Sequence, residues 1–204
     1  MAADKFVLSP TQIESSAALA VGLTSPTIPQ AKVAETETKP DIQQLLVIEY
    51  DPSWKCPDCS PNEQYVLEQL QEQTKITDRN ALATIMGNIK QESLFIPNIC
   101  EGGDRIPYGD CHSGGYGLIQ WTSINRYNNL GRFCKNYGCD PSTLEGQTRY
   151  MINESTFQRI LPEFEGRGYT ISQYMVPAYY WLGWGIKGKR EVYAYEYTEK
   201  LINV

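Results

Sequence analysis

The chain has 204 residues, enough for one domain of ordinary size with an extension. Its formal net charge of −6 at pH 7 excludes the basic footprint that non-specific nucleic-acid binding or docking on anionic lipid requires. No apolar run approaches the length of a membrane span, and the first residues lack the basic and apolar segments of a secretory signal.

Residues 1–60 differ in composition from the rest of the chain. They are rich in proline, and residues 33–39 read Val-Ala-Glu-Thr-Glu-Thr-Lys, a stretch made mostly of Thr, Glu and Lys. Such a segment cannot bury much apolar surface by itself. We therefore predict an extended N-terminal arm over residues 1–60, ordered by neighbouring subunits or serving as a plain linker, and a folded domain over residues 61–204.

From Pro61 onward the spacing of apolar residues is mainly helical. Asp78 is a suitable N-cap, and Ser142 opens a capping box with Glu145. Glycine breaks the helical pattern between residues 100 and 117, where we expect a small hairpin or loop. The expected helices cover residues 62–74, 78–91, 118–135, 142–157, 170–184 and 190–202. The predicted fold class is α+β, mainly α, with one small β or loop element preceded by the extended arm.

The six cysteines fall into three pairs that are close in sequence: Cys56/Cys59, Cys100/Cys111 and Cys134/Cys139. Local disulfides and free thiols are both compatible with this spacing. A zinc site is disfavoured because one Cys-x-x-Cys stands alone and His112 is the single histidine. A Cys–His peptidase would need a cysteine other than the adjacent Cys111. We expect no metal and no cofactor.

Glu92 is the strongest candidate for a catalytic residue. At ~100° per residue, it lies roughly 50° from the centre of the apolar stripe formed by the helix that begins at Asp78. Burial and the negative end of the helix both disfavour the ionised form of a carboxyl group there. A carboxylic acid that keeps its proton near neutral pH is what a glycosidase needs to protonate the leaving oxygen. Phe95 and Trp121 are the expected walls of its pocket, and the alternative is a boundary glutamate whose tip reaches solvent.

Two motifs carry a resemblance to a known family. Gly87-Asn88 is followed by Glu92-Ser93, and Gly115-Tyr-Gly-Leu-Ile-Gln-Trp-Thr122 comes after an intervening loop. Together they resemble the phage tail lysozyme family of the lysozyme-like superfamily, over about residues 75–204. The pattern is also similar to lytic transglycosylases and goose-type lysozymes.

The resemblance implies a lysozyme-like domain that cleaves the β-1,4 bond between N-acetylmuramic acid and N-acetylglucosamine in peptidoglycan. It places Glu92 as the general acid and Gln120 beside it in the cleft. We expect Tyr116 and Trp121, with Tyr108 as a further candidate, to stack on sugar faces. The expected substrate-binding residues are Gln120, Trp121, Tyr116, Thr122 and Ser93; the alternative for this segment is a glycine-bounded turn whose side chains enter the core.

The second carboxylate of such an enzyme is less defined. Glu101, nine residues after Glu92, is our candidate, and Asp104 and Asp110 lie in equally plausible positions of the same loop. If none of them faces the cleft, a lytic transglycosylase with a single glutamate is favoured.

The leading hypothesis is therefore a muramidase of a phage tail, made in the host cytoplasm and acting from the virion on the cell wall or in the periplasm. Residues 1–60 would bind other tail or baseplate proteins. The alternatives are a catalytically idle structural or wall-binding tail protein and a soluble endolysin.

Overall fold

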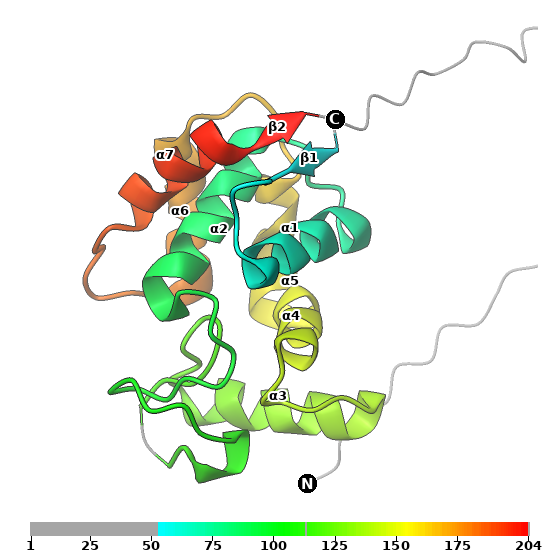
Figure 1. The fold of residues 1–204 in the computed structure, drawn as a ribbon, viewed down its shortest axis with the longest axis vertical. Coiled ribbons are helices and arrows are strands. Elements are labelled where there is room, and N and C mark those ends of the chain that lie inside the picture. The colour runs from blue at the N-terminus through cyan, green and yellow to red at the C-terminus, as the bar shows by residue number, and fades with distance from the viewer. Residues whose placement is uncertain (1–52, 113, 204) are drawn as a thin grey trace, which may run out of the picture. The chain divides into compact units, whose positions relative to one another are not determined.

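The computed structural model describes residues 53–112 and 114–203 (Figure 1). This part of the chain is mainly helical, with one small sheet, which confirms the predicted fold class. Its helices are α1 (Pro61–Gln73), α2 (Arg79–Ser93), α3 (Ile124–Tyr137), α4 (Leu144–Asn153), α5 (Ser155–Phe164), α6 (Ile171–Leu182) and α7 (Arg190–Lys200). The sheet consists of β1 (Trp54–Lys55) and β2 (Ile202–Asn203).

The two strands join opposite ends of the described chain. They pair antiparallel, with Trp54 opposite Asn203, and Gln71 of α1 exchanges two hydrogen bonds with the backbone of Trp54 (2.7 and 2.9 Å). Both β1 and the Cys56–Cys59 disulfide belong to the folded part, although they precede residue 61. The predicted arm otherwise lies outside the described residues.

Asp78 caps α2 as expected, whereas the capping box expected at Ser142 is not formed, because the N-cap of α4 is Thr143. The Asp78 side chain accepts hydrogen bonds from the amides of Asn80 and Ala81, which fixes the start of α2 (2.8 and 3.2 Å). Helices α1 and α6 each open with a capping box, α1 through Ser60 and α6 through Thr170. Helix α2 runs to Ser93, so Glu92 lies in its last turn rather than after its end.

The helix expected over residues 118–135 begins only at Ile124, after the N-cap Ser123. Leu118 and Ile119 lie instead in a buried turn, where Gly117 and Gln120 adopt left-handed backbone angles (φ 74° and 52°). These angles end any helical run, so apolar spacing alone misplaced this helix start.

The helix expected over residues 142–157 is two helices, α4 and α5, separated at Glu154. Glu154 has an extended backbone (ψ 133°), and its 4 %-exposed carboxylate binds Arg126 of α3 through two hydrogen bonds of 2.6 Å. The break between α4 and α5 therefore coincides with a bidentate ion pair to a residue 28 positions earlier in the chain. The local spacing of apolar residues did not predict it.

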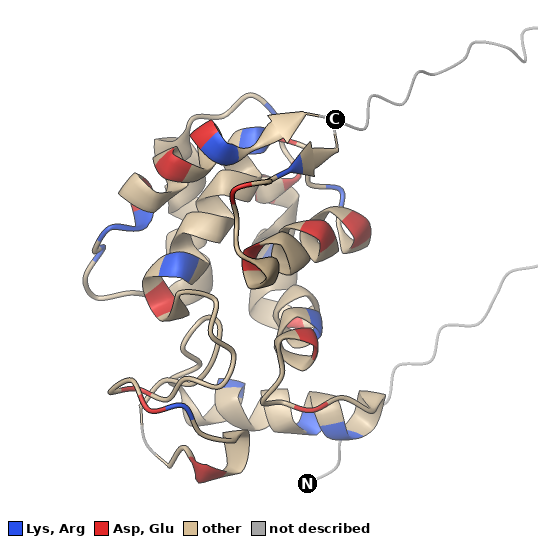
Figure 2. Ribbon diagram, in the orientation of Figure 1, with Lys and Arg blue, Asp and Glu red and all other residues tan. Residues whose placement is uncertain are grey.

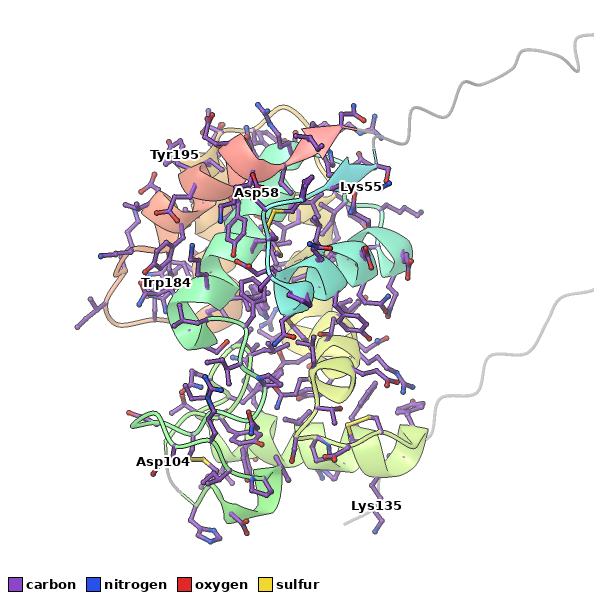
Figure 3. The ribbon with its side chains drawn as sticks, viewed as in Figure 1. Lys55, Asp58, Asp104, Lys135, Trp184 and Tyr195 are labelled. Carbon is purple, nitrogen blue, oxygen red and sulfur yellow. A yellow bond between two sulfur atoms is a disulfide. The ribbon has the colours of Figure 1, made fainter. Side chains whose placement is uncertain are left out.

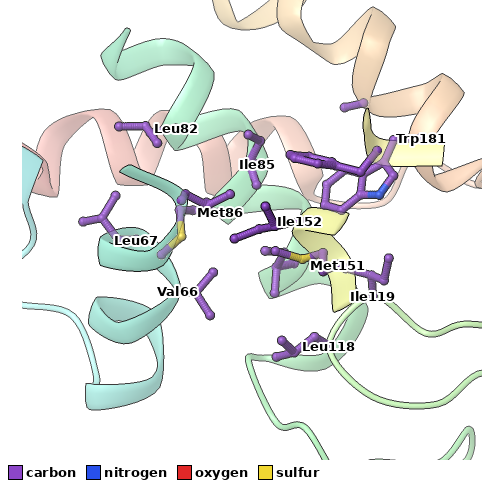
Figure 4. Packing of buried hydrophobic residues seen from close by; sticks show 14 of the residues in the cluster. Val66, Leu67, Leu82, Ile85, Met86, Leu118, Ile119, Met151, Ile152 and Trp181 are labelled. Carbon is purple, nitrogen blue, oxygen red and sulfur yellow. The ribbon is translucent and has the colours of Figure 1, made fainter. Parts of the chain in front are cut away.

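Helix α2 forms the centre of the core. Every residue from Ala81 to Ile89 is buried, and Figure 4 shows Leu82, Ile85 and Met86 among side chains of α1 and α4. Gly87 lets α7 approach, because a Cβ at this position would lie 2.5 Å from the Ala194 amide nitrogen. The carboxyl end of α2 is thereby held rigidly against α7.

All six cysteines form disulfides with their neighbours in sequence, Cys56–Cys59, Cys100–Cys111 and Cys134–Cys139. Acidic and basic residues are interspersed over the helices, apart from α1, whose charged residues are all acidic (Figure 2). Among the described residues, no helix is both long and apolar enough to cross a membrane.

Candidate functional site

Glu92 lies at the carboxyl end of α2 with its side chain 15 % exposed. Its Oε1 atom accepts a hydrogen bond from Nη2 of Arg190, the first residue of α7. The Arg190 side chain is 6 % exposed. The sequence placed Glu92 against apolar neighbours, and the structure adds a direct contact with the buried guanidinium of Arg190.

Arg190 is fixed by several contacts besides Glu92. Its Nη1 atom donates to the carbonyl oxygens of Ile186 (3.0 Å) and Lys187 (2.8 Å). The centre of its guanidinium lies 4.7 Å from the centroid of the Trp184 ring, a cation–π contact. The loop between α6 and α7 therefore wraps around this guanidinium and gives it one defined position beside Glu92.

The chain turns sharply just after Glu92. Leu94 and Phe95 both have left-handed backbone angles (φ 53° and 61°), which are unfavourable for bulky residues. Burial of the Phe95 ring and a hydrogen bond from Asn62 to its carbonyl (2.9 Å) hold this conformation. Backbone strain of this kind gathers at functional sites.

The glycine-rich motif lies directly against the end of α2. The Ser93 hydroxyl donates to the carbonyl of Leu118 (2.8 Å), and the Leu118 amide donates to Oε1 of the fully buried Gln147 (2.8 Å). Gln147 also donates to the carbonyls of Pro97 and Pro141 (2.5 and 2.7 Å). Ser93 and Gln147 thus position the motif relative to Glu92.

Gln120 and Glu101 approach the same glycine, Gly115. A Cβ at Gly115 would lie 2.9 Å from Oε1 of Gln120, and the Gly115 amide donates to Oε2 of Glu101 (2.9 Å). Gln120 donates from Nε2 to the Gly117 carbonyl (3.0 Å), and its own carbonyl accepts from the exposed Thr122 hydroxyl (2.9 Å). The structure brings these polar groups together on one loop.

Asp104 and Asp110, the other candidates for the second carboxylate, are both exposed, as is Glu101. Asp110 lies in the short 3-10 helix η2 (Tyr108–Asp110), and Asp104 accepts from the Cys100 amide through its backbone carbonyl. No direct hydrogen bond or ion pair between Glu92 and these three residues is found in the described part of the chain.

Tyr116 and Trp121, the expected sugar platforms, are both 0 % exposed. The Tyr116 hydroxyl donates to the Ile106 carbonyl (3.0 Å), and the Trp121 ring packs 5.4 Å from that of Tyr150. Neither ring offers a face on which a sugar could stack in this conformation. Both residues thus follow the alternative stated from the sequence, a glycine-bounded turn whose side chains enter the core.

Tyr108 stacks on Tyr127 at 4.2 Å and borders a hollow of about 460 Å³ beside Thr122 and His112. Burial, reinforced by the nearby Tyr108, raises the pKa of Tyr127 to about 12, so these phenols stay neutral. Because every cysteine is in a disulfide, His112 has no free thiol to activate. In the described residues, no group of three or more His, Cys, Asp or Glu side chains is arranged to hold a metal ion.

The contacts of Arg190, Trp184 and Gln147 around this site were not predicted from the sequence. One signal was available for Arg190: a cation at the first position of a helix opposes the helix dipole, which suggests a carboxylate partner. Nothing in the sequence identified that partner as Glu92, which is 98 residues away.

The described domain is mainly helical, with a partly buried glutamate at the end of α2 and a glycine-rich turn joined to that end through Ser93. The family model described as phage tail lysozyme matches residues 61–175, more than half of the chain, and the chain belongs to this family. Both sequence motifs lie inside the matched region, whereas Trp184 and Arg190 lie beyond it. No curated protein and no solved structure was found to match the chain.

Proposed function

We propose that the protein is a muramidase that hydrolyses the β-1,4 bond between N-acetylmuramic acid and N-acetylglucosamine in peptidoglycan. The observation that carries this proposal is Glu92, held at the end of α2 by the buried guanidinium of Arg190. Membership of the phage tail lysozyme family supports a lysozyme-like, peptidoglycan-cleaving role.

In this mechanism Glu92 is the general acid that protonates the glycosidic oxygen. Arg190 orients the carboxyl group, and the glycosidic oxygen must displace or share that contact when the substrate enters. The Gln120 amide lies on the glycine-rich turn that Ser93 joins to the end of α2, and its role is to bind an N-acetyl group or a water molecule. Ser93 has an indirect role, because its hydrogen bond to Leu118 fixes that turn to α2.

Glu101 is the proposed second carboxylate. Its hydrogen bond from the Gly115 amide fixes it on the same loop as Gln120, and its exposure leaves it accessible to water or substrate. The alternative is a transglycosylase that uses Glu92 alone. Mass spectrometry of the products separates the two, because a transglycosylase leaves a 1,6-anhydro ring and a hydrolase leaves a reducing end.

The experiment that tests the role of Glu92 compares muropeptide release by the full chain and by Glu92→Gln. The variant should release muropeptides at least ~100-fold more slowly, since a general acid contributes about 10²- to 10⁴-fold to the rate. Glu199→Gln changes an exposed glutamate of α7 and is the matched control. Release by Glu92→Gln at the rate of the unaltered chain would exclude Glu92 as the acid, and no release by any of the proteins would favour an idle wall-binding role.

We further propose that the protein acts from a phage tail, with residues 1–60 attaching it to other tail or baseplate proteins. The family membership and the composition of that segment support this placement. Mass spectrometry of purified virions should find the protein there, and removing residues 1–52 should abolish its incorporation. A protein found only in the lysate would instead be an endolysin.

A further inference from the structure

Aromatic side chains gather at the carboxyl end of α6 and in the loop that follows. Tyr179 and Tyr180 are 49 % and 66 % exposed, and Trp184 is half-buried. The Tyr179 ring packs edge-on against Trp184 at 5.3 Å, and the Tyr180 ring lies 5.8 Å from that of Tyr179. Single exposed aromatic residues are ordinary, but a contiguous group marks a binding surface.

This group is continuous with the proposed catalytic site. Gly183 ends α6 with a left-handed backbone angle (φ 66°), and the chain turns so that Trp184 packs on the guanidinium of Arg190. That same guanidinium binds Glu92. In Figure 3, Trp184 accordingly lies beside the carboxyl end of α2.

The chemistry of these side chains suits a carbohydrate. A pyranose ring presents C–H groups on its faces and hydroxyl groups around its edge. An aromatic ring covers such a face with a large apolar area, and a tyrosine adds a phenol group that can hydrogen-bond to a hydroxyl at the edge. Tyr116 and Trp121, two of the platforms that the sequence led us to expect, are buried, so other rings must supply this contact.

We propose that Trp184, Tyr179 and Tyr180 form a platform that binds the glycan strand of peptidoglycan next to Glu92. The inference rests on the proposed function for its choice of substrate, and it adds the residues that hold the strand. Trp184 contacts the guanidinium that binds Glu92, Tyr179 contacts Trp184, and Tyr180 contacts Tyr179, so the three rings form one continuous surface.

The test measures binding apart from cleavage. Full-length Glu92→Gln serves as the parent, so that the strand stays intact, and the probe is soluble glycan strand freed of its stem peptides by an amidase. Isothermal titration calorimetry compares the parent with Tyr179→Ala/Tyr180→Ala in the same background. The matched control is Tyr195→Ala, which removes a ring of similar exposure (52 %) on α7, well away from Trp184 in Figure 3.

The double variant should bind the strand about tenfold more weakly, and the control should bind like the parent. Both rings are on the surface, so the melting temperatures should agree. Equal affinity of the double variant and the parent would overturn the proposal, and so would a parent that binds only stem peptides or does not bind the strand. Failure of the proposed function is a separate result, in which the parent binds the strand but the unaltered chain does not cut it.

Discussion

The ion pair between Glu92 and Arg190 allows a quantitative test of how the acid is held. In Arg190→Met the carboxylate loses its cation, and the carbonyls of Ile186 and Lys187 lose their donor. Removing one partner of a buried pair costs about 3–5 kcal/mol. The two side chains are 6 % and 15 % exposed, so water reaches Glu92 in part. We therefore expect a loss near the lower limit, about 3 kcal/mol.

The complementary change, Glu92→Gln, keeps an acceptor for Arg190 and removes the negative charge. It should cost about 1.5–3 kcal/mol, the net contribution of a hydrogen bond to a charged group. In the double variant neither charge remains unpaired, so its loss should be smaller than the sum of the two single losses. A coupling energy of about 1–2 kcal/mol is expected for side chains in direct contact.

Denaturant unfolding of the four proteins gives these free energies, and thermal unfolding of Arg190→Met should show a drop of about 6–12 °C. Arg149→Met is the matched control, because Arg149 forms a 3.5 Å pair with a glutamate that is 65 % exposed. Such a surface pair contributes at most about 1 kcal/mol. If the loss in the double variant equals the sum of the losses in Arg190→Met and Glu92→Gln to within ~0.3 kcal/mol, the two side chains do not interact and the ion pair is refuted.

Three further outcomes are expected. Gly87→Ala should destabilise the protein by about 1–3 kcal/mol in denaturant unfolding, despite the higher helix propensity of alanine, because the new Cβ meets the backbone of α7. Burial raises the pKa of Glu63, but hydrogen bonds led by the Tyr197 hydroxyl outweigh it and hold the pKa below 4.5. This group therefore contributes stability that is complete above pH 4.5 and lost as the pH falls through the folded-state pKa, so Glu63→Gln should flatten the pH dependence of unfolding below 4.5. Replacing Cys100 and Cys111 with serine should cost about 3 kcal/mol and slow muropeptide release; unchanged release would show that this loop does not form the cleft.

Much of the fold follows from local signals in the sequence. Asp78 and the apolar stripe after it define α2, and the helices over residues 61–73 and 171–182 have equally clear starts. The failures depend on distant contacts. The break at Glu154 accompanies its pair with Arg126, and the pairing of β1 with β2 joins segments that are almost the whole domain apart.

The candidate site also contains some residues that the sequence predicts and others that depend on distant contacts. Its motifs are short and contiguous, so Glu92, Ser93 and Gln120 could be named from the sequence. Burial of a ring is harder to infer, because a tyrosine or tryptophan in a glycine-rich turn has the same sequence whether it faces a cleft or the core. Tyr116 and Trp121 face the core, whereas the half-buried Trp184, far along the chain, packs on the Arg190 guanidinium that binds Glu92.

These long-range contacts bear on how large the catalytic unit is. The family match ends at residue 175, yet Arg190 and the close approach of α7 to Gly87 both lie in the segment that follows. A fragment that ends at residue 175 would expose to solvent the side of α2 that packs on α7. It would also lack Arg190, the cation that binds Glu92. The helix that carries Glu92 is therefore completed by the carboxyl-terminal segment, so α7 belongs to the proposed active site as much as the motif that contains Glu92.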